Sequence, residues 1–129
     1  MNNYRILIVD DVPVNNLLVE KMLARYKFNM RSVCNGKECM DAVETEKPNL
    51  ILLDLMMPVM DGFQVLKEIK GNPELADIKV VVLSALNTNE DIVKAYNLGA
   101  NDFITKPIIL EKLINSVSNQ LKIKELAKN

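Results

Sequence analysis

Short apolar runs alternate with segments of helical periodicity along this chain, and that alternation constrains the fold more than any other feature. The runs are Arg5–Val9 (RILIV), Met30–Val33, Leu50–Leu53 (LILL), Val80–Leu83 (VVVL) and Asp102–Thr105. Uniformly apolar runs are typical of strands that are covered on both faces of a parallel sheet. The second run is a weaker strand candidate and the fifth is short, but five strands that alternate with five helices predict an α/β fold with a doubly wound parallel sheet.

Capping residues mark the ends of the intervening helices. Pro13 is suited to the first turn of a helix, and the expected apolar face of that helix consists of Val14, Leu18 and Met22, with Leu17 beside it. The other boundaries follow the same logic. The second helix is expected to start at Asn35-Gly36 and to end before Pro48, and the third to be capped by Asp61 and closed by Gly71. The fourth is expected to start with the capping box of Thr88 and Asp91 and to be closed by Gly99, and the last to begin just after Pro107.

The 129 residues are enough for one domain, expected over residues 1–121, with residues 122–129 as the end of the last helix or the start of a linker. A second apolar stripe is expected beyond the core face of the last helix, and it predicts either a continuing helix or a frayed tail. The core face is expected to contain Leu110, Ile114, Val117 and Leu121, and the second stripe Ile123, Leu126 and Ala127.

Composition excludes several classes of function. The net charge of −1 indicates no surface for nucleic acid or an anionic membrane, and no apolar run reaches the roughly 18 residues that span a bilayer. The chain has no histidine, which excludes Ser-His-Asp and Cys-His nucleophiles and any role as a phosphohistidine donor. Cys34 and Cys39 are interpreted as free thiols, which favours the cytoplasm.

Polar residues follow four of the predicted strands at the same end. Asp10-Asp11 follows the first strand, Asp54 the third, Ser84 the fourth and Lys106 the fifth. In an open parallel sheet, sites form beyond the carboxyl ends of the strands. Three carboxylates, a hydroxyl and an ammonium are therefore expected to meet in one cleft.

Each of these residues also has a plain structural explanation. Asp10 or Asp11 could cap the first helix, Lys106 could pair with Asp54 or lie in solvent, and Ser84 could be an ordinary strand-end hydroxyl. Their coincidence favours a site instead. Crowded carboxylates call for a cation, and all-oxygen ligands suit Mg²⁺, which bridges to phosphate. The cluster therefore predicts metal-assisted phosphoryl transfer, with a carboxylate that needs no general base.

Four fragments together resemble the receiver domains of two-component signalling. They are VDD at Val9–Asp11, DLMMPVMDG at Asp54–Gly62, SA at Ser84-Ala85 and KP at Lys106-Pro107. The resemblance covers roughly residues 5–120 and implies a flavodoxin-like strand order of 2-1-3-4-5. It also implies a phosphorelay partner, either a histidine kinase or a histidine phosphotransfer protein, and a downstream output domain or protein. The first helix segment, DDVPVNNLL, is similar to receivers of hybrid kinases.

The resemblance implies a role for each matching residue. Asp54 is the phosphoacceptor, Asp10 and Asp11 organise Mg²⁺, and the backbone carbonyl of Met56 is a further metal ligand. Ser84 and Lys106 are implied to contact the phosphoryl group. Phe103, where the family more often has Tyr, is either the switch aromatic or a plain core residue. The output surface is expected over the fourth helix, the fifth strand and the fifth helix.

By the same resemblance, the residues two beyond the acceptor and two beyond the hydroxyl flank the approach of the water that hydrolyses the aspartyl phosphate. Here they are Met56 and Leu86, both large and apolar. Neither side chain can orient a water, so slow self-dephosphorylation is expected. The chain is also expected to promote its own phosphorylation, and it is not expected to act as a metabolic enzyme. A flavin-binding protein would need a phosphate-binding loop after the first strand, and this sequence has two carboxylates there. A haloacid-dehalogenase-type phosphatase would need a second Asp two residues beyond the nucleophile, and this sequence has Met56 there. The remaining alternative is a receiver-like module that binds protein constitutively, without phosphorylation.

Overall fold

The computed structural model describes residues 3–57 and 60–123. Its strands are β1 (Arg5–Val9), β2 (Asn29–Val33), β3 (Leu50–Leu53), β4 (Lys79–Ser84) and β5 (Asp102–Thr105). Its helices are α1 (Pro13–Leu23), α2 (Gly36–Thr45), α3 (Gly62–Gly71), α4 (Asn89–Asn97) and α5 (Leu110–Leu121), with a short 3-10 helix at Ala24–Tyr26. Among these residues no helix is both long and apolar enough to cross a bilayer.

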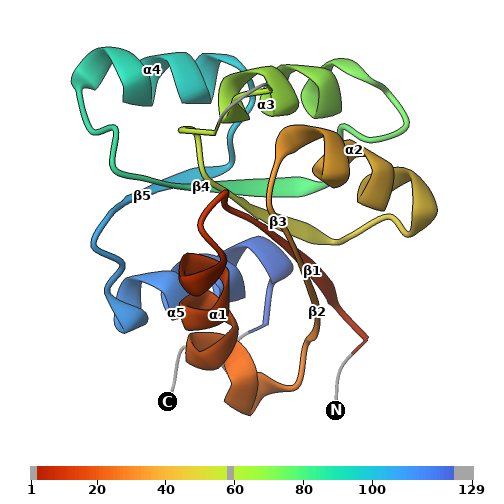
Figure 1. Cartoon of the computed structure of the whole chain (residues 1–129), viewed down its shortest axis with the longest axis vertical. Coiled ribbons are helices and arrows are strands. Elements are labelled where there is room, and N and C mark those ends of the chain that lie inside the picture. Colours follow the sequence, from red (N-terminus) through yellow and green to blue (C-terminus); the bar gives the residue numbers. More distant parts are fainter. Residues whose placement is uncertain (1–2, 58–59, 124–129) are drawn as a thin grey trace.

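The five strands form one parallel sheet in the order β2-β1-β3-β4-β5, as expected. Helices cover both faces: α2, α3 and α4 lie on one side of the sheet, and α1 and α5 lie on the other (Figure 1). Strand order reverses beside β1, because β2 lies on one side of it and β3 on the other. A flavodoxin-like sheet binds its ligand at this reversal, beyond the carboxyl ends of the strands.

Alternate residues of the central strands enter two separate cores, which explains why these strands are apolar throughout. One core lies under α2, α3 and α4 and receives Leu7, Val9, Ile51, Leu53, Val80 and Val82. The other lies under α1 and α5 and receives Ile6, Ile8, Leu50, Leu52, Val81 and Leu83. Because both faces are buried, the register of each central strand is tightly specified.

Side-chain caps begin three helices where the sequence predicted them. Asn35 accepts a hydrogen bond from the Glu38 N–H, Asp61 from the Gln64 N–H, and Thr88 from the Asp91 N–H. Each cap satisfies one of the backbone donors that a helix leaves unpaired in its first turn.

The buried face of α1 differs from the one predicted. Val14, Leu17 and Leu18 are 64%, 49% and 51% exposed, whereas Val19 and Leu23 are buried. Apolar residues occupy almost every side of this helix, so periodicity did not identify its inward face. The inward row of α1 consists instead of Asn16, Val19 and Leu23.

The last helix also corrects the prediction. Leu110 is 47% exposed, although the other three residues of the expected core face are buried. The helix ends at Leu121, because Lys122 adopts a left-handed conformation with φ of 58°. Ile123 does not turn away but packs against the core under α1 and α5. Leu126 and Ala127 lie outside the described residues.

Candidate functional site

The ends of β1 and β3 place three carboxylates together. Val9 pairs with Leu53, and the Asp54 N–H donates to the Val9 carbonyl at 2.9 Å, so Asp10 and Asp54 leave adjacent strands at the same level. Both aspartates are 6% exposed. Asp11 adds a third, more accessible carboxylate, and one oxygen of each group lies within 4.8 Å of the others. The expected convergence of the three aspartates is therefore present.

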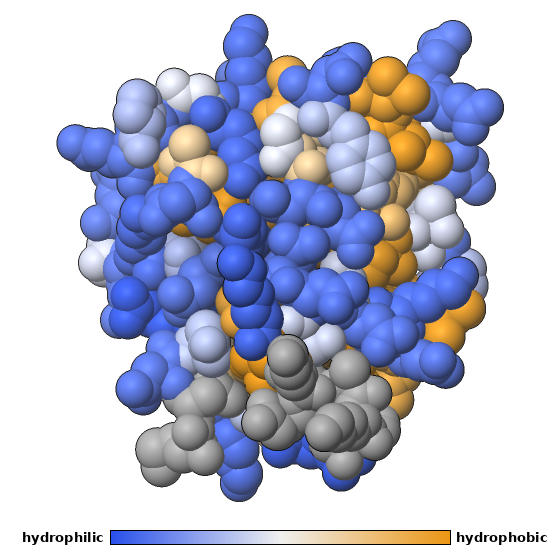
Figure 2. All heavy atoms as spheres, turned by 180° about the vertical axis from the view of Figure 1, so that it is seen from behind, coloured by the Kyte–Doolittle hydropathy of each residue, from blue (hydrophilic) through white to orange (hydrophobic). Residues whose placement is uncertain are grey.

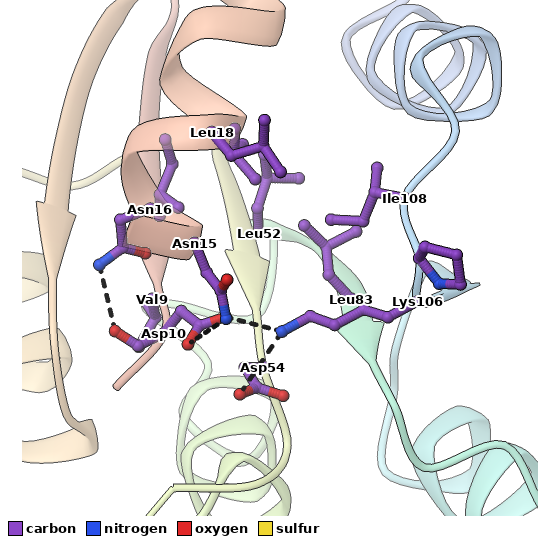
Figure 3. A pocket seen from close by; sticks show the side chains of 13 residues that line it. Val9, Asp10, Asn15, Asn16, Leu18, Leu52, Asp54, Leu83, Lys106 and Ile108 are labelled. Carbon is purple, nitrogen blue, oxygen red and sulfur yellow. Dashed lines mark hydrogen bonds and ion pairs between the residues drawn. The ribbon is translucent and has the colours of Figure 1, made fainter. Parts of the chain in front are cut away.

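Lys106 reaches the same cluster from β5. The backbone N–H of Lys106 donates to the Ser84 carbonyl at 2.9 Å, which extends the pairing of β4 with β5 beyond the last residue of β5. Its Nζ lies 2.7 Å from Asp10 Oδ2 and 3.9 Å from Asp54 Oδ2 (Figure 3). Three carboxylates and one ammonium leave a formal excess of two negative charges in the cluster.

Burial raises the pKa of Asp54 above its ordinary value of 3.8. The Lys106 ammonium and a hydrogen bond from the Met56 N–H, at 3.3 Å, oppose that rise in pKa, whereas the charges of Asp10 and Asp11 add to it. The carboxylate of Asp54 is therefore an incompletely compensated buried charge, which a further cation would stabilise.

Gly62 lets α3 approach the backbone of Asp54. A Cβ at Gly62 would lie 2.3 Å from the Asp54 carbonyl oxygen and 2.6 Å from the Leu55 Cα. The Gly62 N–H also donates to the Leu55 carbonyl at 3.0 Å. The start of α3 is thus packed directly against the end of β3, and only glycine fits there.

The donor set of the cluster fits Mg²⁺. This ion prefers carboxylate and carbonyl oxygens and retains several waters, so it suits a partly open group of carboxylates. Asp10, Asp11 and Asp54 provide oxygens at close range, and Asp11 keeps the cluster accessible. The excess negative charge of the cluster favours occupancy by a divalent cation.

The remaining predicted residues, Ser84, Met56 and Phe103, add no charged side chain to this cluster. Ser84 is fully buried, and its hydroxyl accepts a hydrogen bond from the Leu86 N–H at 3.1 Å. The Met56 side chain is 54% exposed. Phe103 is half-buried against the core under α2, α3 and α4, a position compatible with both roles considered for it.

Two asparagines of α1 also contact the cluster, and sequence reasoning missed them. Asn15 Nδ2 lies 3.4 Å and 3.3 Å from the two carboxylate oxygens of Asp10. Asn16 is buried and its Nδ2 donates to the Asp10 carbonyl at 3.1 Å (Figure 3). The available signal was a pair of polar residues that begins four positions after Asp11, with Asn16 in line with Val19 and Leu23 at helical spacing.

A pocket of about 240 Å³ opens beside the cluster, between α1 and the loop that follows β5 (Figure 3). Asp10, Asp54 and Lys106 form its polar end. Its walls are mainly apolar, with Leu18, Val19, Leu52, Leu83 and Ile108 among them. The pocket leaves the carboxylates and the ammonium reachable from the α1 side of the sheet.

The fold and this cluster define a known class. The family model described as the response regulator receiver domain matches residues 6–118. The chain therefore belongs to the response-regulator receiver domain family of two-component systems. It is similar to the response regulator PleD of Caulobacter vibrioides, with 38% identity over 104 residues that cover 81% of this chain and 23% of PleD. The chain thus spans about a quarter of that relative.

Solved structures agree with this assignment. The signal receiver domain of a signal transduction histidine kinase from Syntrophus aciditrophicus has a TM-score of 0.85 and 34% identity, over 92% of this chain and 90% of that one. The Mn²⁺-bound form of response regulator Rcp1 has a TM-score of 0.79 and 32% identity, over 94% of each chain.

Proposed function

We propose that Asp54 accepts a phosphoryl group from a phosphohistidine of a partner protein, with Mg²⁺ bound at the acidic cluster. The observation that carries the proposal is the geometry of Asp54, a buried carboxylate beside two other carboxylates and 3.9 Å from the Lys106 ammonium. The chain has no histidine, so the donor must belong to another protein or domain. Membership of the receiver family supports the same chemistry.

In the transfer, an Asp54 carboxylate oxygen attacks the phosphorus in line with the phosphorus–nitrogen bond of the donor. The oxygen–phosphorus bond forms as that bond breaks, and the imidazole leaves as a neutral ring when its other nitrogen carries a proton. Lys106 provides positive charge for the phosphoryl oxygens. Asp10, Asp11, Asp54 and the Met56 carbonyl would hold Mg²⁺, which supplies further charge neutralisation on the phosphoryl group. Rcp1 binds a divalent metal, Mn²⁺.

The proposal is tested by intact mass after incubation with Mg²⁺ and acetyl phosphate. We expect the wild type to gain one base-labile phosphoryl group and Asp54→Asn to gain none. Asp41→Asn, on the exposed face of α2, is the matched control and should behave as the wild type. Stoichiometric modification of Asp54→Asn would refute the assignment of the acceptor.

The proposed output is a change in the surface of α4, β5 and α5. On phosphorylation the Ser84 hydroxyl would move toward Asp54 and Phe103 would turn inward, a shift between two existing states. α4 suits such a change because Ala95 is its only buried residue. Figure 2 shows hydrophobic atoms at the surface on the side where α4 lies, and Val93 and Tyr96 are 56% and 44% exposed.

The proposed partners are a histidine kinase or histidine phosphotransfer protein, and an output domain or protein. Exposed apolar side chains flank the cleft on α1 and at the start of α5, and such groups often mark a protein-binding surface. They are Val12, Val14, Leu17, Leu18, Ile109 and Leu110. The same exposed residues favour a second candidate, a module that binds protein constitutively without phosphorylation.

Amide chemical shifts with and without beryllium fluoride distinguish these two functions. We expect shifts at the cluster and also along residues 89–121. Shifts confined to the cluster, with residues 89–121 silent, would favour the constitutive module.

A further inference from the structure

We propose that Asn16 is a positioning residue for the Mg²⁺ site and fixes the direction in which Asp10 presents its carboxylate. This inference rests on the proposed function, because it concerns the affinity of the same cluster for Mg²⁺. Asn16 does not reach the carboxylates itself. It acts through the backbone of Asp10.

The amide of Asn16 joins the ends of two strands. Its Nδ2 donates to the Asp10 carbonyl, directly beyond β1, and to the Val33 carbonyl, the last residue of β2, each at 3.1 Å. The Asp10 N–H donates to the same Val33 carbonyl at 3.3 Å. Both peptide groups of Asp10 are therefore held, one through Val33 and the other through Asn16.

This anchoring matters because the chain turns at Asp10. The Val12 N–H donates to Asp10 Oδ1 at 2.9 Å, so the Asp10 carboxylate is bonded to the turn that its own backbone begins. Without the Asn16 amide, the peptide between Asp10 and Asp11 loses its side-chain partner at the carbonyl. Rotation of that peptide would move both carboxylates relative to Asp54.

The position of Asn16 is costly by the ordinary rules of helix packing. It lies in the inward row of α1 with Val19 and Leu23, and it is 3% exposed. Its Oδ1 has no hydrogen-bond partner among the described residues. An apolar side chain of similar size would avoid the cost of burying that oxygen. The two bonds of Nδ2 are thus the contribution that an apolar residue cannot replace.

Mg²⁺ is sensitive to small displacements of its ligands because it requires near-octahedral geometry. Groups that orient metal ligands typically change metal affinity by 10–100-fold when they are removed. We therefore expect Asn16→Leu, which keeps the volume but removes both bonds, to lower Mg²⁺ affinity at least about tenfold. Its resistance to urea without metal should change little, because it also removes the unpaired buried oxygen.

Asn101→Leu is the matched control. Asn101 Oδ1 accepts a hydrogen bond from the Val80 N–H at 2.8 Å, so this residue also anchors a strand end. That strand end is the amino end of β4, whereas the cluster lies beyond the carboxyl ends of the strands. The control should lower resistance to urea and leave Mg²⁺ affinity within about twofold of the wild type. Affinity is measured by titration with MgCl₂ alone, and the titration is monitored by calorimetry and by the amide chemical shifts of Asp10 and Asp11.

Equal affinities in the wild type and in folded Asn16→Leu overturn the inference, and so does an equal loss of affinity in Asn101→Leu. If Asn16→Leu does not fold, Asn16→Ala is measured in the same way, and wild-type affinity in that variant overturns the inference. A wild type that binds no Mg²⁺ refutes the proposed function and this inference with it. A wild type that binds Mg²⁺ while the Asn16 variants bind equally well refutes the inference alone.

Discussion

Replacing Gly62 by alanine tests whether α3 must approach the backbone at the end of β3 as closely as the structure shows. The added Cβ would lie 2.3 Å from the Asp54 carbonyl oxygen and 2.6 Å from the Leu55 Cα, both backbone atoms. Backbone cannot rotate away as a flexible side chain does, so α3 or the loop after β3 must shift. Overpacking of this kind typically costs about 1–3 kcal/mol, and we expect the upper end, about 3 kcal/mol, for Gly62→Ala.

Gly71→Ala provides the matched control in the same helix. Apart from its chain neighbours and the backbone of its own helix, nothing lies within 4 Å of a Cβ built at Gly71, so the substitution meets open space. Alanine is favoured over glycine in a helix by up to about 1 kcal/mol, and at this last residue of α3 we expect about 0.5 kcal/mol of stabilisation or no change. The two substitutions add the same methyl group, so they differ only in what that group meets.

The assay is urea unfolding followed by circular dichroism, without metal. With a slope of about 2 kcal/mol per molar urea, a cost of about 3 kcal/mol lowers the midpoint by about 1.5 M. The folded fraction of Gly62→Ala should also bind Mg²⁺ more weakly, since the shift involves the Asp54 backbone. A Gly62→Ala midpoint within about 0.3 M of the wild type would refute the argument from close approach.

Three further predictions concern the cluster and its flanks. Burial raises the pKa of Asp54, so this carboxyl binds a proton more readily in the folded chain, and its ionisation opposes folding as pH rises above 3.8. Asp54→Asn should therefore resist urea better than the wild type at pH 7 without metal, and a difference that does not shrink toward pH 4 would contradict this. Asp11→Ala should bind Mg²⁺ at least about tenfold more weakly by calorimetry, because it removes an anionic ligand, and unchanged affinity would count against the acidic pair. Met56→Asn and Leu86→Glu introduce groups that can orient a water, and they should speed the decay of phospho-Asp54 by up to about 100-fold, measured by intact mass over time. If neither variant decays faster than the wild type, the argument that Met56 and Leu86 slow hydrolysis is wrong.

Sequence reasoning recovered the architecture because its signals were local and strong. The central strands are apolar at every position, and they are buried on both faces as such a pattern requires. The caps at Asn35, Asp61 and Thr88 were also identified correctly, since a cap is decided by a residue and the three that follow it. The convergence of Asp10 and Asp54 followed from the parallel sheet, in which all carboxyl ends meet at one edge.

What the sequence by itself determined is therefore the order of the elements, the kind of sheet and the residues that emerge at its carboxyl edge. Only the tertiary structure decided which side of α1 faces inward. Apolar residues surround that helix, and in the folded chain Leu18 is half exposed whereas Asn16 is buried. Local periodicity did not select among the sides of this helix, because apolar residues lie on most of them. The contact of Asn16 with Asp10 and Val33 became visible only once all three segments were placed together.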